Sequence, residues 1–165
     1  MKFVFNILLT LLIISKASLA DETKVFNFTE IELSKLEVRK VRGADNKTTY
    51  TVGTNKNGAF LKSVADNAAS GLGKEIKIDL NKTPFINITW KIEKDLSGIK
   101  ENTKKGHDFA ARVFAVKKTG ATILSNRAIN YVFSSNSDAG LNWPSPYTKK
   151  SIDYVLSTTK ENLNE

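Results

Sequence analysis

The chain has 165 residues, no cysteine and a formal net charge of +8, from 25 Lys and Arg against 17 Asp and Glu. The lack of cysteine excludes disulfides, thiol catalysis, zinc–thiolate sites and iron–sulfur clusters. Most of the basic residues are lysines scattered among acids, a pattern that predicts a solvated surface and no nucleic-acid partner.

The first twenty residues have the pattern of an export signal. Lys2 supplies a positive start, and residues 3–14 form an apolar run too short to span a bilayer. The small residues Ser18 and Ala20 stand where a signal peptidase cleaves. We therefore expect cleavage after Ala20, a periplasmic or secreted bacterial protein, and no transmembrane segment after cleavage. The alternative is an uncleaved N-terminal anchor. Residues 21–165 have the length of a single domain.

Apolar and polar residues alternate with period two over much of the remaining chain. The alternation is clearest over residues 72–80 and 85–94, which are separated by a turn at residues 81–84. It predicts two half-buried strands. Weaker strands are expected at residues 25–28, 36–41, 49–52, 59–65, 128–135 and 152–157. Residues 29–38 are expected to form at most a helical turn or two.

Short strands with frequent turns and no long amphipathic helix predict an all-β protein built as an antiparallel β-sandwich. Residues 108–116, "DFAARVFAV", are apolar on both faces. This pattern predicts a central strand covered on both sides.

Asp108 and Arg112 interrupt that apolar strand and share one of its faces. An extended chain would place their Cα atoms roughly 13 Å apart, too far for direct pairing. Each charge would then need a partner on a neighbouring strand, such as Asn130 or Tyr131. We interpret the pair as part of a buried polar network that sets strand register, or alternatively as groups that orient a ligand.

His107 is the one histidine of the chain and stands at the expected start of this strand. The sequence lacks a nucleophile motif and a suitably spaced second histidine, so we predict neither a catalytic nor a metal-ligating role. We expect His107 to be a surface or rim residue.

The segment "NWPSPY", residues 142–147, is the best candidate for binding. Two prolines stiffen a loop that presents Trp143 and Tyr147, and both side chains suit stacking on a sugar ring or another flat apolar surface. The alternative is a hydrophobic plug at the open end of the sandwich.

Several segments together resemble a bacterial family catalogued as domain of unknown function 3047. They are "ASGL" (69–72), "TP" (83–84), Trp90, "GHDFAARVFAV" (106–116) and "INYVFSS" with "NWPSPYT" (129–135 and 142–148). The resemblance covers about residues 49–156. It implies a secreted β-sandwich of jelly-roll type, related in shape to carbohydrate-binding modules, with no established activity.

The chain departs from that family in two places. Members usually carry a second aspartate where this chain has His107. The family also continues beyond the position of Glu165 with further strands and an Asp-rich loop. We therefore expect a C-terminal truncation; the alternative is a shortened member with an exposed sheet edge.

The leading functional hypothesis is a non-enzymatic module that binds a glycan or another envelope component. Trp143 and Tyr147 would contact the ligand, and Asp108, Arg112 and Asn130 would be structural or orienting groups, without metal or cofactor. One alternative is an envelope-polymer hydrolase that pairs Asp108 with Asp138 or Asp153. Another is an assembly protein that accepts a partner strand at a free edge.

Overall fold

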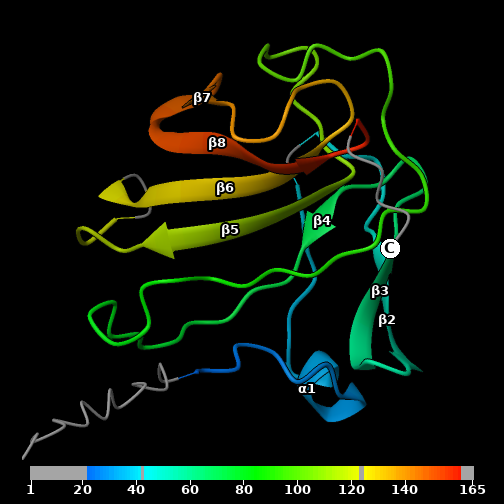
Figure 1. The fold of residues 1–165 in the computed structure, drawn as a ribbon, viewed down its shortest axis with the longest axis vertical. Helices are drawn as coiled ribbons and strands as arrows, with labels where there is room; N and C mark the ends of the chain where they lie inside the picture. Colours follow the sequence, from blue (N-terminus) through cyan, green and yellow to red (C-terminus); the bar gives the residue numbers. More distant parts are fainter. Residues whose placement is uncertain (1–21, 42, 123–124, 161–165) are drawn as a thin grey trace, which may run out of the picture. The chain divides into compact units, whose positions relative to one another are not determined.

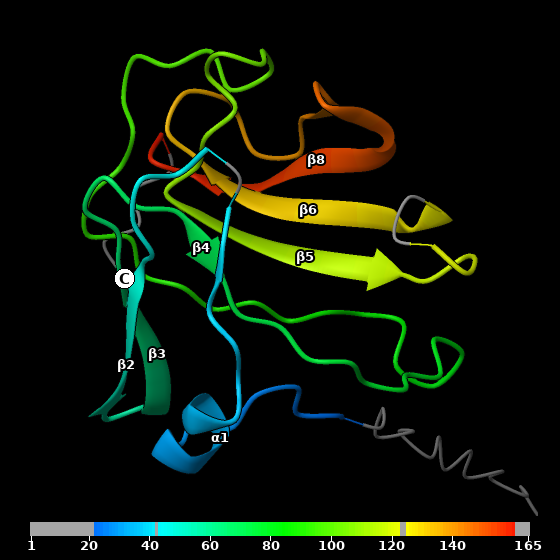
Figure 2. The ribbon, with the colours of Figure 1, turned by 180° about the vertical axis from the view of Figure 1, so that it is seen from behind.

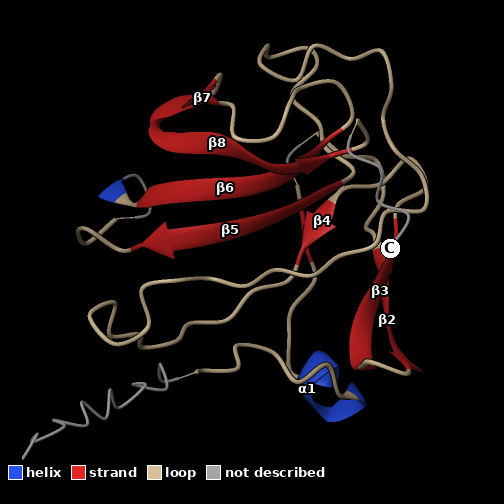
Figure 3. Cartoon of the chain, viewed as in Figure 1, coloured by secondary structure: helices blue, strands red, loops and turns tan. Residues whose placement is uncertain are grey.

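A computed structural model describes residues 22–41, 43–122 and 125–160, so the predicted signal and its cleavage site at Ala20 lie outside the described residues. The fold is all-β and of the sandwich-like class that the sequence predicts (Figures 1 and 3). Its elements are α1 (Glu30–Ser34), β1 (Arg39–Lys40), β2 (Thr49–Asn55), β3 (Gly58–Val64), β4 (Ser70–Gly71), β5 (Ala111–Lys117), β6 (Arg127–Ser134), β7 (Asn142–Ser145) and β8 (Thr148–Thr158). No helix among the described residues is long and apolar enough to cross a membrane.

The described residues form two compact units, unit 1 up to residue 87 and unit 2 from residue 88 onward. In unit 1, helix α1 begins after Thr29, whose hydroxyl accepts a hydrogen bond from the Glu32 amide. The Glu32 carboxylate in turn accepts from the amides of Asn27 and Phe28. These contacts satisfy backbone donors around the start of the helix and confirm the predicted helical turn.

Two antiparallel strand pairs complete unit 1, β1 with β4 and β2 with β3. The β2–β3 hairpin confirms the strands predicted at residues 49–52 and 59–65. Its turn ends at Gly58, where φ is +113°, a backbone conformation that favours glycine.

Unit 2 is built around a four-stranded sheet in the order β5-β6-β8-β7, whose long strands lie side by side in both ribbon views (Figures 1 and 2). The outer pairs are antiparallel, but β6 and β8 run parallel, so the sheet is mixed rather than wholly antiparallel. The difference arises because β7 adds at the edge and turns back into β8. Pro144 is tolerated in β7 because an edge strand has backbone positions that need no ladder partner.

The core of unit 2 lies on both faces of this sheet. One face carries Phe109, Val132 and Val155, with Trp143 packed against them. Phe133 follows Val132 and therefore points to the opposite face. There its ring meets Trp90 edge-on at a centroid distance of 6.2 Å, and the Trp90 indole donates a hydrogen bond to the Ser157 hydroxyl.

The structure corrects the prediction of a central strand at residues 108–116. Strand β5 lies at an edge of the sheet, and the Phe114 and Val116 side chains on it are 53% and 56% exposed. Apolar residues on both faces of this strand therefore did not mean that both faces are buried or that the strand is central. The pattern reflects the chemistry of the side chains and not the number of neighbouring strands.

The two strands predicted with the clearest alternation, residues 72–80 and 85–94, do not form β-ladders in the structure. The turn between them does form, with the Lys82 and Thr83 amides donating to the Asp79 carbonyl. Alternating burial also persists in part, since Ile88, Trp90 and Ile92 are half-buried while Thr89, Lys91 and Glu93 are exposed. Alternation thus predicted the half-buried side chains of residues 88–92 only, and it did not predict a hydrogen-bonding partner for either segment.

Candidate functional site

Strand register places three of the polar or aromatic residues of unit 2 in one row across the sheet. Asn130 on β6 is opposite Asp153 on β8, and Asp153 is opposite Trp143 on β7. Residues paired in register point to the same face. The row therefore lies on the face that carries Phe109 and Val155.

Asp153 is the centre of the site. Its side chain is 1% exposed, and both carboxylate oxygens accept hydrogen bonds, one from Asn130 Nδ2 and one from His107 Nε2, each at 2.8 Å. Burial alone would raise the pKa of this carboxyl. The hydrogen bonds from His107 and Asn130, with the positive charge of Arg112, outweigh burial and hold the pKa of Asp153 below its usual value.

His107 is not the surface residue that the sequence predicts. Its side chain is only 8% exposed. The ring contacts the Asp153 carboxylate and stands edge-on to the rings of Phe109 and Tyr147, each at a centroid distance of 5.4 Å. Because a carboxylate only accepts hydrogen bonds, Nε2 carries a proton. The partner is 46 residues away in sequence, so no local pattern indicated it.

Asp108 and Arg112 contact one another directly, contrary to the prediction. Arg112 Nη2 lies 3.3 Å from Asp108 Oδ1. The estimate from an extended chain failed because β5 begins only at Ala111, so the backbone between the two residues is not a regular strand. The Asp108 carboxylate is 66% exposed, whereas the Arg112 side chain is 27% exposed.

The Arg112 guanidinium also lies over the Phe109 ring, 4.9 Å from its centroid. Burial lowers the pKa of Arg112, and the negative charges of Asp108 and Asp153 oppose that effect. Arg112 therefore forms an ion pair with the exposed Asp108 and interacts with the buried Asp153 through charge alone.

The β7–β8 hairpin presents the two predicted aromatic residues differently. Tyr147 occupies the two-residue turn after Pro146, and its side chain is on the surface, 66% exposed. Its hydroxyl donates a hydrogen bond to the Lys104 carbonyl at 2.9 Å. Trp143 is half-buried against the core. The five residues singled out from sequence therefore converge on one site, through His107 and Asp153.

A second buried carboxylate, Glu101, was not singled out from sequence. It is 2% exposed and accepts hydrogen bonds from the Ser135 amide at 2.9 Å, the Ser137 hydroxyl at 3.1 Å and the Ser134 hydroxyl. Ser134 is the last residue of β6, and Ser135 and Ser137 follow it, so Glu101 joins the segment before β5 to the end of β6. The run "SSNS" (residues 134–137) could have suggested a cluster of hydrogen-bond donors, but the sequence did not indicate that Glu101 is their acceptor.

Replacing Trp143 with alanine is expected to lower the free energy of unfolding by about 2–4 kcal/mol, because the side chain fills space against Phe109, Val132 and Val155. Phenylalanine should cost less than about 1.5 kcal/mol, since it retains most of the packing and removes an indole N–H that is buried without a partner among the described residues. Urea denaturation measures both values. A loss below about 1 kcal/mol for alanine would show that Trp143 is not a plug.

Comparison with curated proteins gave no match, and comparison with solved structures gave none either. A family model described as protein of unknown function (DUF3047) matches residues 34–165, a span that includes every residue of the site. The chain belongs to the DUF3047 family.

Proposed function

We propose that this protein is an exported, non-enzymatic module that binds a glycan of the bacterial cell envelope, with Tyr147 as its principal contact. The observation that carries the proposal is a surface aromatic ring held in one orientation. Tyr147 is 66% exposed, yet its hydroxyl donates a hydrogen bond to the Lys104 carbonyl and its ring makes an edge-on contact with the His107 ring. An aromatic side chain fixed before binding loses little conformational entropy when a ligand stacks on it.

Polar groups of the same site supply directional contacts for a sugar. The Asp108 carboxylate is largely exposed and is positioned by Arg112 and by the Phe109 amide. A carboxylate accepts hydrogen bonds from hydroxyl groups, and a guanidinium donates them. A flat aromatic surface beside such groups matches the chemistry of a sugar ring, which is apolar on its faces and polar around its rim.

The geometry favours binding over hydrolysis. Glycoside hydrolysis requires two carboxyl groups that reach the scissile bond. Asp153 is buried, and both its oxygens are engaged. Asp138 forms an exposed ion pair with Lys160. Of the three acids considered for a hydrolase, Asp108 alone combines an exposed carboxylate with a place in the site.

Replacing Tyr147 with alanine should reduce the affinity for the envelope glycan at least about tenfold, because the loss of a central aromatic contact commonly costs more than 1 kcal/mol of binding energy. Stability should change little, since the side chain is mostly exposed. Co-sedimentation of the full chain with peptidoglycan sacculi, chitin and cellulose measures the binding. Phe85→Ala is the matched control, because Phe85 is another exposed aromatic residue, 86% exposed. Equal binding by both variants would contradict the proposal.

A further inference from the structure

A pocket of about 330 Å³ lies within unit 2, in the loop that precedes His107. It is lined by Gly98, Ile99, Lys100, Thr103, Lys105 and Gly106. This volume is at the lower end of the range for small-molecule sites and is suited to one sugar residue or one acidic substituent. None of the site residues described above lines it.

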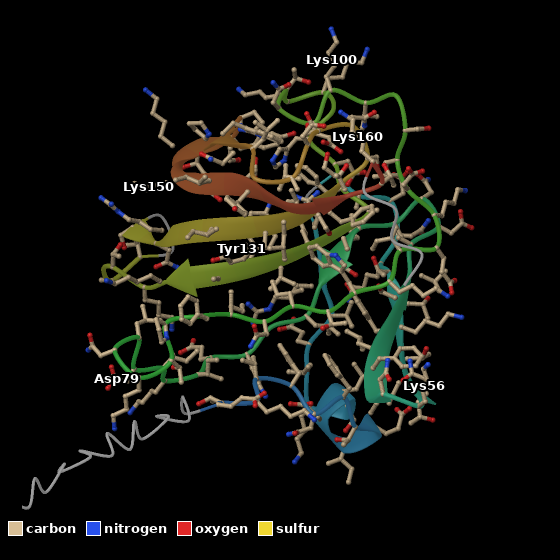
Figure 4. The ribbon with its side chains drawn as sticks, viewed as in Figure 1. Lys56, Asp79, Lys100, Tyr131, Lys150 and Lys160 are labelled. Atoms are coloured by element: carbon tan, nitrogen blue, oxygen red, sulfur yellow. The ribbon has the colours of Figure 1, made fainter. Side chains whose placement is uncertain are left out.

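The pocket has a positive lining. Lys100 and Lys105 are exposed, and neither forms an ion pair with another described residue. Figure 4 shows Lys100 on the surface of this loop. The nearest acid in sequence, Glu101, forms no ion pair with these lysines, because its carboxylate is buried among serines at and after the end of β6.

The backbone that lines the pocket is held by hydrogen bonds within its own loop. The Thr103 hydroxyl and amide both donate to the Lys100 carbonyl, and the Gly106 amide donates to the Thr103 carbonyl. A Cβ atom at Gly106 would stand 2.5 Å from the Lys100 carbonyl oxygen, so this approach requires glycine. At the other end, the Gly98 amide donates to the Asn136 side chain. The pocket is thus held in shape before any ligand arrives.

The same loop is joined to the exposed ring of the proposed glycan surface. Lys104, whose carbonyl accepts the Tyr147 hydroxyl, stands between the lining residues Thr103 and Lys105. Neighbouring Cα atoms are about 3.8 Å apart, so the backbone group that holds the Tyr147 hydroxyl is next to the lining of the pocket.

We infer that this pocket takes the anionic group, a carboxylate or a phosphate, of an acidic envelope glycan whose neutral ring stacks on Tyr147. The inference rests on the proposed function and adds the substrate class. The two lysines supply the charge, and Tyr147 supplies the apolar contact. Attraction between exposed charges weakens with salt, so the preference for the acidic ligand should decline between 10 and 150 mM NaCl.

Calorimetry of the full chain with three disaccharides that share one skeleton tests the inference: cellobiose, cellobiuronate and cellobiose 6-phosphate. At low salt, one acidic form should bind roughly tenfold more tightly than cellobiose, as expected for one or two charge-assisted contacts. The stronger acid identifies carboxylate or phosphate. Lys100→Gln with Lys105→Gln should abolish this advantage. The control is Lys56→Gln with Lys62→Gln. Lys56 is in the turn of the β2–β3 hairpin (Figure 4) and Lys62 is in β3. This variant removes the same charge and should preserve the advantage.

Equal affinity for the three disaccharides would overturn the inference and leave the Tyr147 surface intact as a neutral-glycan site. No binding of either acid would overturn it as well. If both double-lysine variants lost the preference for the acidic disaccharides equally, the preference would come from the net charge of the protein. That result would also contradict an anion site in the pocket. The proposed function itself is decided separately, by the sedimentation of Tyr147→Ala against Phe85→Ala.

Discussion

Replacing Asp153 with alanine is expected to lower the free energy of unfolding by about 3–5 kcal/mol, the cost of removing one partner from a buried charged network. The substitution leaves the His107 ring and the Asn130 amide without their shared acceptor. It also removes one of the two negative charges that oppose the effect of burial on Arg112, the other being Asp108. Urea denaturation followed by tryptophan fluorescence reports on this region, because both tryptophans, Trp90 and Trp143, belong to unit 2.

The matched control is Asp138→Ala, which removes an exposed carboxylate paired with Lys160. An exposed ion pair contributes at most about 1 kcal/mol, so this variant should unfold almost as the wild type does. If Asp153→Ala cost no more than Asp138→Ala, the buried network would not support the fold.

Asp153 also predicts how stability responds to acid. Its folded-state pKa lies below the usual value, whereas the unfolded chain titrates near about 3.9. The folded state therefore binds fewer protons in this range, and the contribution of Asp153 to stability is fully present above the unfolded pKa. It is lost as the pH falls through the lower folded pKa. Asp153→Ala should flatten this part of the acid transition, and an unchanged slope would contradict the assignment.

Glu101→Ala should lower the free energy of unfolding by about 3 kcal/mol, because a buried carboxylate is removed from three donors at and just after the end of β6. Hydrogen exchange of the amides over residues 96–106 should rise at the same time, since Glu101 supplies three of the hydrogen bonds that join this segment to the end of β6 and the residues after it. The control is Glu93→Ala, whose carboxylate is 73% exposed. Unchanged exchange in Glu101→Ala would show that the loop is held by other contacts.

Local sequence patterns account for much of the sheet but not for its order. Strands β2, β3, β6 and β8 follow from short runs of β-branched and aromatic residues between turns. The edge position of β5 and the parallel pairing of β6 with β8 depend on where distant segments pack, and alternation carries no information about that. Residues 72–80 show the same limit: their alternation is strong, yet Ile76 and Ile78 are 42% and 44% exposed.

Part of the site could be predicted from the sequence on physical grounds. Prolines around Tyr147 indicated a stiff loop, and charges within an apolar strand indicated a polar network. Asp153 and His107, which hold the network together, were missed as a pair because their contact spans 46 residues. His107 lacked any motif, and sequence reasoning treats an unpatterned histidine as exposed. The lesson is that a charge inside an apolar strand predicts a polar network, while the members of that network can be identified only from the fold.

We propose that a glycan binds at Tyr147 and the adjoining loop, on a surface held in place by buried polar contacts. The most direct test is a titration of the ¹⁵N-labelled full chain with soluble peptidoglycan fragments, followed through its backbone amide resonances. Glycan binding at this site should produce shifts concentrated at residues 104–108 and at Tyr147, and Tyr147→Ala should abolish them. Shifts centred on the β2–β3 hairpin, or on the exposed Phe114 and Val116 of β5, would contradict it.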